Sequence, residues 1–524
     1  MKMISISRIG VCLLSMAMCV FNLNAQGGLR PRGDVNCDWE VNIADVNFLI
    51  NAILSNVKYH SFYTYAMDVN EDREINIADV NIIYNALLGG QLPPMPSYSG
   101  TLPVLYINTE RHKNIVSKED YLHADWWLDP MGAEGVEPLG SATEPLGMLI
   151  KGRGNYSWLH SDKKPFRIKL DEKQPLMGMK KNRHFCLLPH DHWTSPFGFE
   201  LSRRIGLSYT PALQHIEVVL NGQYIGLYLL TEKIRVGKNR VNIIKQENAE
   251  TDEGLITGGW LLEIDNHPDE NQFVFQEGNG NWMGVKYHSP DSLSQEQFNY
   301  IYRYFKDVDN AIYDEQDSVG AWMDYIDIDT LACFYIVNEI ADNIESFTNS
   351  LYLHKQRGDS TKLLFGPVWD LGTSYGRPEL EQPCFIYENT AENFTPHWLV
   401  RLSGFPDFQD AVHLHWNRFY HSGLATMEDY MNALVNRITP ASRADRTRWP
   451  ADYIWFEDVK EYSDDYYIPH MREKINFLNE QWGNYPNEAG VNYEIEATGE
   501  VRIEGGFTVE QGAQFTIKPS EYNK

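Results

Sequence analysis

The sequence predicts an α+β protein in three parts: a small all-α domain, a large α+β domain and a short β segment at the C-terminus. Residues 33–90 contain a duplicated segment rich in Asp and Asn, and each copy continues into apolar positions at helical spacing. Residues 101–485 begin with alternating, strand-like stretches and end in helical patterns, whereas residues 490–524 alternate again. The 524 residues are enough for two or three such units.

Composition narrows the class of protein. Hydrophobic residues make up 43% of the chain and aromatic residues 13%, so a large core can form. The formal net charge of -27 argues against non-specific binding to nucleic acid or to an anionic membrane, because both need a basic face. No run after the N-terminal segment reaches the ~18–20 apolar residues of a membrane span. We therefore expect neither a nucleic-acid partner nor a membrane span.

Residues 1–25 have the pattern of a signal peptide. Lys2 and Arg8 form a positive start, residues 9–21 are a short apolar run, and Ala25 marks the expected cleavage site. The mature protein is therefore expected to be secreted, either extracellular or periplasmic.

Four cysteines remain beyond this segment: Cys37, Cys186, Cys333 and Cys384. They are far apart and lack CxxC spacing, which argues against a zinc site and against a disulfide-rich framework.

The duplicated segment has the spacing of a calcium-binding loop. Oxygen-bearing side chains recur at the positions from which a 12-residue loop wraps Ca²⁺, so two Ca²⁺ sites are expected. The ligand candidates are Asp34, Asn36, Asp38, Glu40, Asn42 and Asp45 in the first copy, and Asp68, Asn70, Asp72, Glu74, Asn76 and Asp79 in the second. The alternative is a pair of Asp/Asn-rich turns without metal. Crowded carboxylates repel one another unless a cation neutralises them, so the domain is expected to fold with Ca²⁺.

Residues 30–90 resemble a dockerin type I domain, the calcium-dependent module that binds cohesin. The resemblance covers both repeats and implies an EF-hand-like fold and a cohesin-type protein partner. Position 6 of the loop is often glycine in such loops, whereas Trp39 and Arg73 stand there in this chain. Prolines in residues 91–100 predict a short stiff linker to the large domain.

Strand patterns come first in the large domain. They occur at residues 104–107, 149–150, 166–170 and 258–264, and a hairpin is expected at 216–230 because Asn221-Gly222 favours a type I′ turn.

Helical spacing dominates the second half of the large domain. It starts after residue 294, and a buried helix is expected at 331–340. A buried strand at 363–369 is expected to end at Asp370, and residues 406–483 are mostly helical in pattern.

Five sequence pieces of the large domain occur in the same order in one family. They are KGRGNYSW (151–158), KKPFRIKL (163–170), LNGQYIGLYLLTEKI (220–234), GWLLEID (259–265) and FGPVWD (365–370). Together they resemble the CotH family, secreted or spore-coat proteins with an atypical protein-kinase-like fold. The resemblance spans roughly residues 103–480 and implies ATP, Mg²⁺ and a protein substrate phosphorylated on Ser or Thr.

Phosphoryl transfer needs cations on the phosphates, a carboxylate on Mg²⁺ and a second carboxylate that orients the acceptor hydroxyl. Lys169, Arg153 and Lys164 are the candidate cations, and Glu232 could pair with a strand lysine such as Lys169. The alternative for each of these four is a solvated strand edge or surface position.

Carboxylates suited to the same chemistry follow the buried helix and the last predicted strand. By resemblance, Asp370 binds Mg²⁺ with help from Asn343, and Glu345 or Asp342 is the catalytic acid that orients the acceptor.

Three departures from the family pattern bear on activity. Gly372 stands where a second acidic or amide ligand is common, Glu345 is one methylene longer than the usual Asp, and an Arg-Asn pair is absent near residues 190–197. The run His190-Asp191-His192 is interpreted as structural, because i, i+2 spacing does not put two side chains on one helical face.

Three functions therefore remain open. The chain is an active secreted kinase tethered through its dockerin, or a catalytically degraded scaffold, or a carbohydrate-active component with a glycan partner. Two observations favour the third: dockerins usually accompany glycosidases, and the many Trp and Tyr residues suit sugar stacking. Against it, no convincing pair of carboxylates flanks a cleft.

Overall fold

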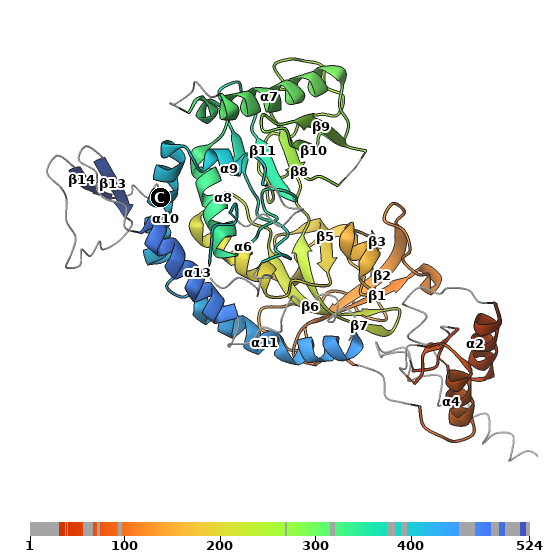
Figure 1. The fold of residues 1–524 in the computed structure, drawn as a ribbon. Helices are drawn as coiled ribbons and strands as arrows, with labels where there is room; N and C mark the ends of the chain where they lie inside the picture. Colours follow the sequence, from red (N-terminus) through yellow and green to blue (C-terminus); the bar gives the residue numbers. More distant parts are fainter. Residues whose placement is uncertain are drawn as a thin grey trace, which may run out of the picture.

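A computed structural model of the protein describes most of the chain. The described residues are 31–36, 38, 40–55, 67–70, 74–92, 97–267, 270–314, 320–374, 383–388, 396–449, 467–483, 492–497 and 514–519. The predicted signal peptide, Cys37, Trp39, Asp72, Arg73 and the linker prolines Pro93, Pro94 and Pro96 lie outside them. The protein is α+β, as predicted, with a small helical module, a large β-rich body and a separate pair of strands (Figure 1).

The small module contains helices α2 (Ile43–Ser55) and α4 (Ile77–Leu87), each following one copy of the repeat. The apolar positions of the two copies pack into one core: Val35, Val46, Leu49, Ala52, Met67, Val69, Val80 and Ile83. Asn76 caps α4 in a capping box with Asp79. One liganding position of the second copy therefore also fixes the start of a helix.

The first half of the large body is a closed seven-stranded barrel. Its strands are β1 (Val104–Thr109), β2 (Leu122–Asp129), β3 (Leu146–Gly152), β4 (Phe166–Gln174), β5 (Asn182–Leu188), β6 (Leu213–Leu220) and β7 (Gln223–Glu232). They pair in the order β1-β2-β3-β4-β5-β7-β6, and β6 closes the barrel by pairing with β1 in parallel. The alternation in residues 166–170 places Ile168 and Leu170 in the barrel core and turns Arg167 and Lys169 away from it.

The predicted hairpin is confirmed. Strands β6 and β7 are joined by Asn221 and Gly222, which both have positive φ, as a type I′ turn requires.

The second half of the body combines a five-stranded sheet with helices. The sheet has the order β12-β11-β8-β10-β9 and consists of β8 (Trp260–Ile264), β9 (Gln272–Gln276), β10 (Trp282–Ser289), β11 (Leu351–Lys355) and β12 (Leu363–Phe365). The α-helices of the body are α5 (Tyr156–His160), α6 (Thr194–Ile205), α7 (Gln295–Tyr313), α8 (Ile328–Ile340), α9 (Leu399–Leu402), α10 (Pro406–Ser422), α11 (Met427–Arg448) and α13 (Tyr467–Trp482). Except for α5, whose Trp158 packs against the barrel core, their apolar side chains share one core with this sheet. Helix α8 belongs to this core and is buried from Leu331 to Ile340.

The strand expected at 363–369 ends early, at Phe365. Gly366 has a φ of 108° and Pro367 has no N–H to donate, so the ladder cannot continue. The five residues between Phe365 and Leu371 therefore form a loop, and Asp370 lies on that loop.

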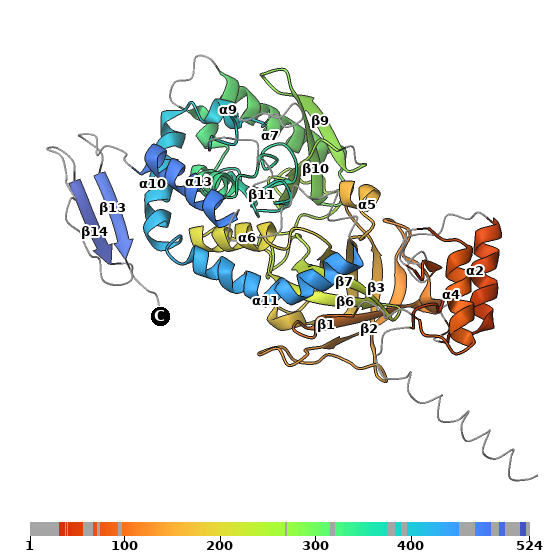
Figure 2. The same cartoon turned by 60° about the horizontal axis from the view of Figure 1, so that its bottom comes forward.

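Helix α11 connects the two halves. Figure 2 shows it running beneath α6 and along β6 and β7. Its first turns contribute Met427, Met431 and Leu434 to the core of the helical half, whereas Trp449, just after it, packs into the barrel core.

Two short strands follow the body, as predicted for the C-terminal segment. Strand β13 (Asn492–Ala497) pairs in parallel with β14 (Gln514–Pro519). Within the described residues, no helix combines the length and the apolar character needed to cross a membrane. Cys186, Cys333 and Cys384 are free thiols.

Candidate functional site

The first calcium loop brings its carboxylates together. Ligand oxygens of Asp34, Asp38 and Asp45 lie within 4.8 Å of one another, and Asp34 and Asp45 are fully buried. Asp45 Oδ1 accepts the backbone N–H groups of Val35 (2.7 Å) and Asn36 (3.0 Å), while its Oδ2 accepts that of Asn42 (2.9 Å). These hydrogen bonds hold the backbone of the loop around Asp45, its last liganding residue. Three converging carboxylates are the donor set that Ca²⁺ prefers, so the residues fit the metal.

The second loop repeats this arrangement. Asp79 Oδ1 accepts from Val69 (2.7 Å) and Asn70 (3.3 Å), and its Oδ2 accepts from Asn76 (3.0 Å). Arg32 connects the two copies, because its Nη1 donates to Val69 O at 3.0 Å.

The second candidate centre surrounds the loop after β12. Asp370 is exposed on this loop. Its Oδ2 accepts from Ser350 Oγ at 3.3 Å, and Asn343 Nδ2 donates to its backbone oxygen at 3.0 Å. Desolvation raises the pKa of Asp370, whereas the charge of Arg153 lowers it.

Two further acids lie close to Asp370. A methyl group on Gly372 would lie 3.4 Å from Asp191 Oδ1 and 3.5 Å from Asp370 Oδ1, so both carboxylates face the same glycine. Desolvation and the charges of Asp370 and Glu345 raise the pKa of Asp191 to about 7. Desolvation and the charge of Asp370 raise the pKa of Glu345 to about 7. A cation between these groups would relieve their repulsion.

The backbone is strained at this centre. Asp191, Asp342, Ser350 and Asp370 all have positive φ, between 49° and 61°. Non-glycine residues in this region are uncommon and cluster at functional sites when tertiary contacts hold them there.

The structure separates the two predicted alternatives for the catalytic acid. Asp342 faces Lys474 on α13 at 3.2 Å, and Lys474 also pairs with Glu339 at 2.9 Å. Glu345 instead lies near Asp370 and accepts from Asn349 Nδ2 at 3.0 Å through Oε1. The geometry therefore favours Glu345 over Asp342.

Asn343, the expected metal ligand, is fully buried and engaged in hydrogen bonds. Its amide oxygen accepts from Thr373 Oγ1 at 2.7 Å, and its nitrogen donates to Asn338 Oδ1 and to the backbone oxygen of Asp370. In this structure it positions the Asp370 loop.

Among the predicted cations, Arg153 is the one beside the acids. Its guanidinium lies 5.8 Å from the ring centre of Trp369, and its charge acts on Asp370. Lys164 Nζ donates to Trp158 O at 2.7 Å. Lys169 lies on the outer face of the barrel, opposite His184 on β5.

Glu232 pairs with a cation other than the one expected. It forms an ion pair with Arg240 at 2.5 Å and accepts from Tyr209 at 3.1 Å, so it does not pair with Lys169.

Asp191 is the residue that sequence reasoning missed. The sequence pattern of residues 190–192 was interpreted as structural, because the spacing of the two histidines did not suit a metal site. His190 Nε2 indeed bonds with Ser161 Oγ at 2.9 Å, away from the acids. The position of Asp191 in the chain could have indicated its role. It lies in the loop between the end of β5 and the start of α6, and loops commonly carry functional side chains.

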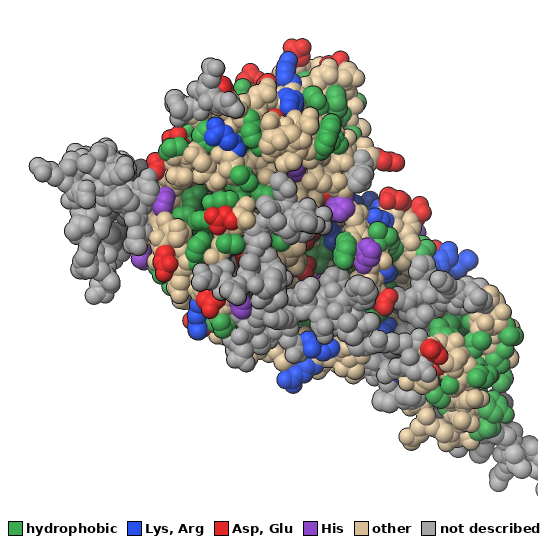
Figure 3. All heavy atoms as spheres, viewed as in Figure 1, with side chains coloured by type: hydrophobic (Ala, Val, Ile, Leu, Met, Phe, Trp, Pro, Cys, Tyr) green, Lys and Arg blue, Asp and Glu red, His purple; other side chains and the backbone are tan. Residues whose placement is uncertain are grey.

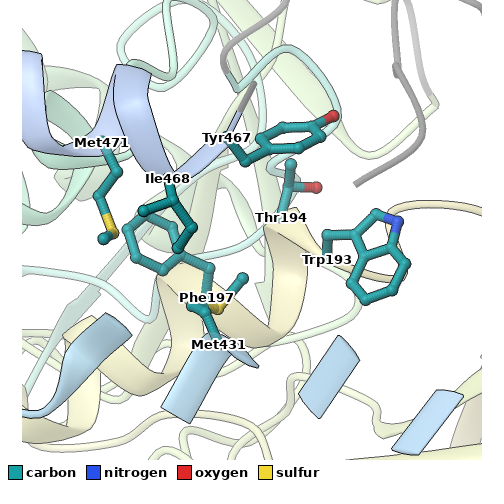
Figure 4. A pocket seen from close by; sticks show the side chains of 7 residues that line it. All are labelled: Trp193, Thr194, Phe197, Met431, Tyr467, Ile468 and Met471. Atoms are coloured by element: carbon teal, nitrogen blue, oxygen red, sulfur yellow. The ribbon is translucent and has the colours of Figure 1, made fainter. Parts of the chain in front are cut away.

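A small apolar depression lies beside α6 but lacks the charged groups of a reaction centre. Figure 4 shows its lining by Trp193, Thr194, Phe197, Met431, Tyr467, Ile468 and Met471. None of the seven side chains that line it carries a charge.

The chain thus combines a two-loop acidic calcium module with an α+β body that carries an acidic centre with positive φ values. Two family models match the chain: "CotH kinase protein" over residues 150–478 and "Dockerin type I domain" over residues 32–92. The first covers more than half of the 524 residues, so the chain belongs to the CotH kinase protein family. The dockerin type I domain implies calcium binding and a cohesin partner. A search of curated proteins found no match.

The raised pKa of Asp191 predicts a pH-dependent effect of Asp191→Asn on stability. A carboxyl with a pKa of about 7 in the folded state and about 4 when unfolded stabilises the fold at low pH, and this contribution is lost as pH rises from 4 to 7. The variant should therefore melt about 2–4 °C above the wild type at pH 8 without magnesium, and close to it at pH 4.5. Thermal unfolding at the two pH values tests this, and an equal difference at both would contradict it.

Proposed function

We propose that residues 150–478 form an ATP- and Mg²⁺-dependent protein kinase domain, which the dockerin attaches to a cohesin partner. The observation that carries the proposal is the approach of Asp191, Asp370 and Glu345 to one another beside Arg153. Family membership supports the same class of reaction.

Metal binding at this centre would use few protein ligands. Within the described residues, three acidic ligand atoms lie within 4.8 Å of one another only in the first calcium loop. The centre around Asp370 is wider, which suits Mg²⁺, because this ion usually takes one or two carboxylates and completes its shell with phosphate oxygens and water. Asp370 and Asp191 would hold it, so Asp191 would supply the carboxylate that Gly372 cannot.

Each remaining group has one task in the proposed reaction. Bound Mg²⁺ would neutralise charge on the transferring phosphate. Arg153 holds phosphate oxygens, and Glu345 accepts the proton of the acceptor Ser or Thr hydroxyl. A pKa near 7 suits Glu345 to that role at neutral pH. Asn343 keeps the Asp370 loop in place.

The proposal is tested by titrating Mg²⁺ and ATP into the full chain by calorimetry, beside Asp370→Asn. The variant should bind Mg·ATP at least tenfold more weakly and lose phosphotransfer by roughly a thousandfold, because the metal is left with one carboxylate. Asp125→Asn is the matched control, since Asp125 is an exposed carboxylate on β2. Wild-type binding in Asp370→Asn would remove Asp370 from the site. Absence of binding by the wild type at millimolar ATP would favour the binding-only scaffold, which the full use of Asn343 in hydrogen bonds also favours.

The dockerin would provide the attachment through an exposed apolar surface. Ile43, Leu54, Ile77, Tyr84, Leu87 and Leu88 are exposed on α2 and α4 or at their ends. Figure 3 shows hydrophobic side chains gathered over this module. Apolar surface of this kind marks a protein-binding site, so a secreted partner of cohesin type is the expected occupant.

A further inference from the structure

The five-stranded sheet ends in an open edge strand, β9. The order β12-β11-β8-β10-β9 places it at one margin, and among the strands that the structure describes it pairs with β10 alone. Figures 1 and 2 both show β9 on the outside of the body. An edge strand presents a row of backbone N–H and C=O groups to which another strand can pair.

The hydrogen bonds to β10 show which backbone groups of β9 face outward. The N–H of Tyr287 on β10 donates to the oxygen of Asn271, the residue just before β9, at 3.0 Å. Alternate residues of an antiparallel strand turn their backbone groups to opposite sides, so odd-numbered residues of β9 face β10. Gln272, Val274 and Gln276 therefore direct their N–H and C=O groups toward the open side.

One contact from α7 agrees with this direction. Lys306 Nζ donates to the backbone oxygen of Gln276 at 2.9 Å, which requires that oxygen to point away from β10. The oxygen keeps a second lone pair for a further donor.

Strand β9 lacks the usual features that prevent an edge from pairing. Its sequence, QFVFQ (Gln272–Gln276), contains neither a charged residue nor proline, which natural edge strands commonly carry. Phe273 and Phe275 are buried against α7, whereas Val274 points to the opposite face and is 50% exposed. Trp282 on β10 lies on the same outer face and is 63% exposed. The open edge therefore has an apolar outer face beside it.

The strand is also complementary to itself. QFVFQ reads the same in both directions around Val274. In an antiparallel pair of two copies with a twofold axis at Val274, the two Val274 residues lie opposite each other. Gln272 then lies opposite Gln276 of the second copy, and phenylalanine lies opposite phenylalanine. A twofold interface requires this kind of self-complementary surface.

We propose that the chain forms a homodimer in which β9 pairs antiparallel with β9 of a second copy. The outward backbone groups of Gln272, Val274 and Gln276 then bond with those of the second copy, and the two sheets become one continuous sheet. The interface contains no residue of the acidic centre or of the calcium loops, so it stands or falls independently of the kinase proposal. Because each copy carries a net charge of -27, dimerisation should tighten as salt screens the repulsion.

Sedimentation velocity of the full chain, with Ca²⁺ and at ~0.15 M salt, tests the proposal. The wild type should reach twice the monomer mass as its concentration rises. Val274→Lys and Val274→Glu should each weaken dimerisation by about tenfold or more, because like charges then meet at the axis. An equimolar mixture of the two variants should restore dimerisation, since Lys then faces Glu. Val116→Lys, at another exposed apolar position, should dimerise like the wild type. All three substituted side chains are exposed, so each variant should melt close to the wild type.

Hydrogen exchange identifies the backbone pairing itself. Amide exchange within Gln272–Gln276 should slow with increasing protein concentration in the wild type but not in Val274→Lys. A wild type that stays monomeric, or a dimer that both Val274 variants leave intact, would overturn the proposal. A dimer that is lost in Leu54→Lys on α2 and kept in the Val274 variants would place the interface on the dockerin and equally refute it.

Discussion

Removal of Ca²⁺ is expected to unfold residues 32–92 and leave the large body folded. Asp34 and Asp45 are fully buried, and their oxygens lie within 4.8 Å of those of Asp38. Buried carboxylates without a counter-ion cost several kcal/mol each, which exceeds what a core of eight small and medium apolar side chains can offset. Chelation should therefore abolish the helical signal of α2 and α4 in a cooperative step, with a calcium affinity on the order of micromolar.

Single-loop variants make this prediction specific. Asp45→Asn and Asp79→Asn remove equivalent ligands, because each carboxylate accepts three backbone N–H groups of its own loop. Calorimetry should find about one high-affinity Ca²⁺ in each variant instead of about two. Retention of both sites in either variant, or a module whose helices survive chelation, would contradict the prediction.

The second large effect is expected at the buried ion pair between Lys163 and Asp445, which joins the barrel to α11. Both side chains are 1% exposed, and Lys163 Nζ lies 2.8 Å from the Asp445 carboxylate. Lys163 also donates to Pro189 O and Leu227 O, while Asp445 Oδ1 accepts the N–H of Leu227 at 2.8 Å. Asp445→Ala would leave a buried ammonium without its counter-ion, and this should reduce the free energy of unfolding by about 3–5 kcal/mol.

The chain offers a matched control on the same helix. Glu428 pairs with Arg472, but these side chains are 38% and 59% exposed, so Glu428→Ala should change stability by less than about 1 kcal/mol. Gly226→Ala should approach the effect of Asp445→Ala, because its Cβ would collide with the Asp445 carboxylate and Gly226 has a φ of 107°. Denaturant unfolding of the full chain measures all three, and similar losses in Asp445→Ala and Glu428→Ala would refute the role of the buried pair.

Local patterns were sufficient for several elements of this protein. The liganding positions of both loops, the buried helix α8 and the β6–β7 hairpin each depend on residues close together in the sequence. A calcium loop takes its ligands from 12 consecutive residues, and a type I′ turn depends on two, so spacing alone carries the information. The five family pieces likewise identified the large body by their order.

The candidate reaction centre required the tertiary structure. Asp191 and Asp370 are 179 positions apart, and only the folded chain places both carboxylates against Gly372. The same contacts distinguished Glu345 from Asp342, because Lys474 on α13 engages Asp342. The partner of Glu232 was also decided by the fold, which brings Arg240 from the segment after β7 back to the end of that strand. Sequence spacing therefore determined the modules and their metal loops. Long-range packing determined which charges meet, because electrostatic interactions depend on distance in space and on desolvation, and neither is written in local sequence.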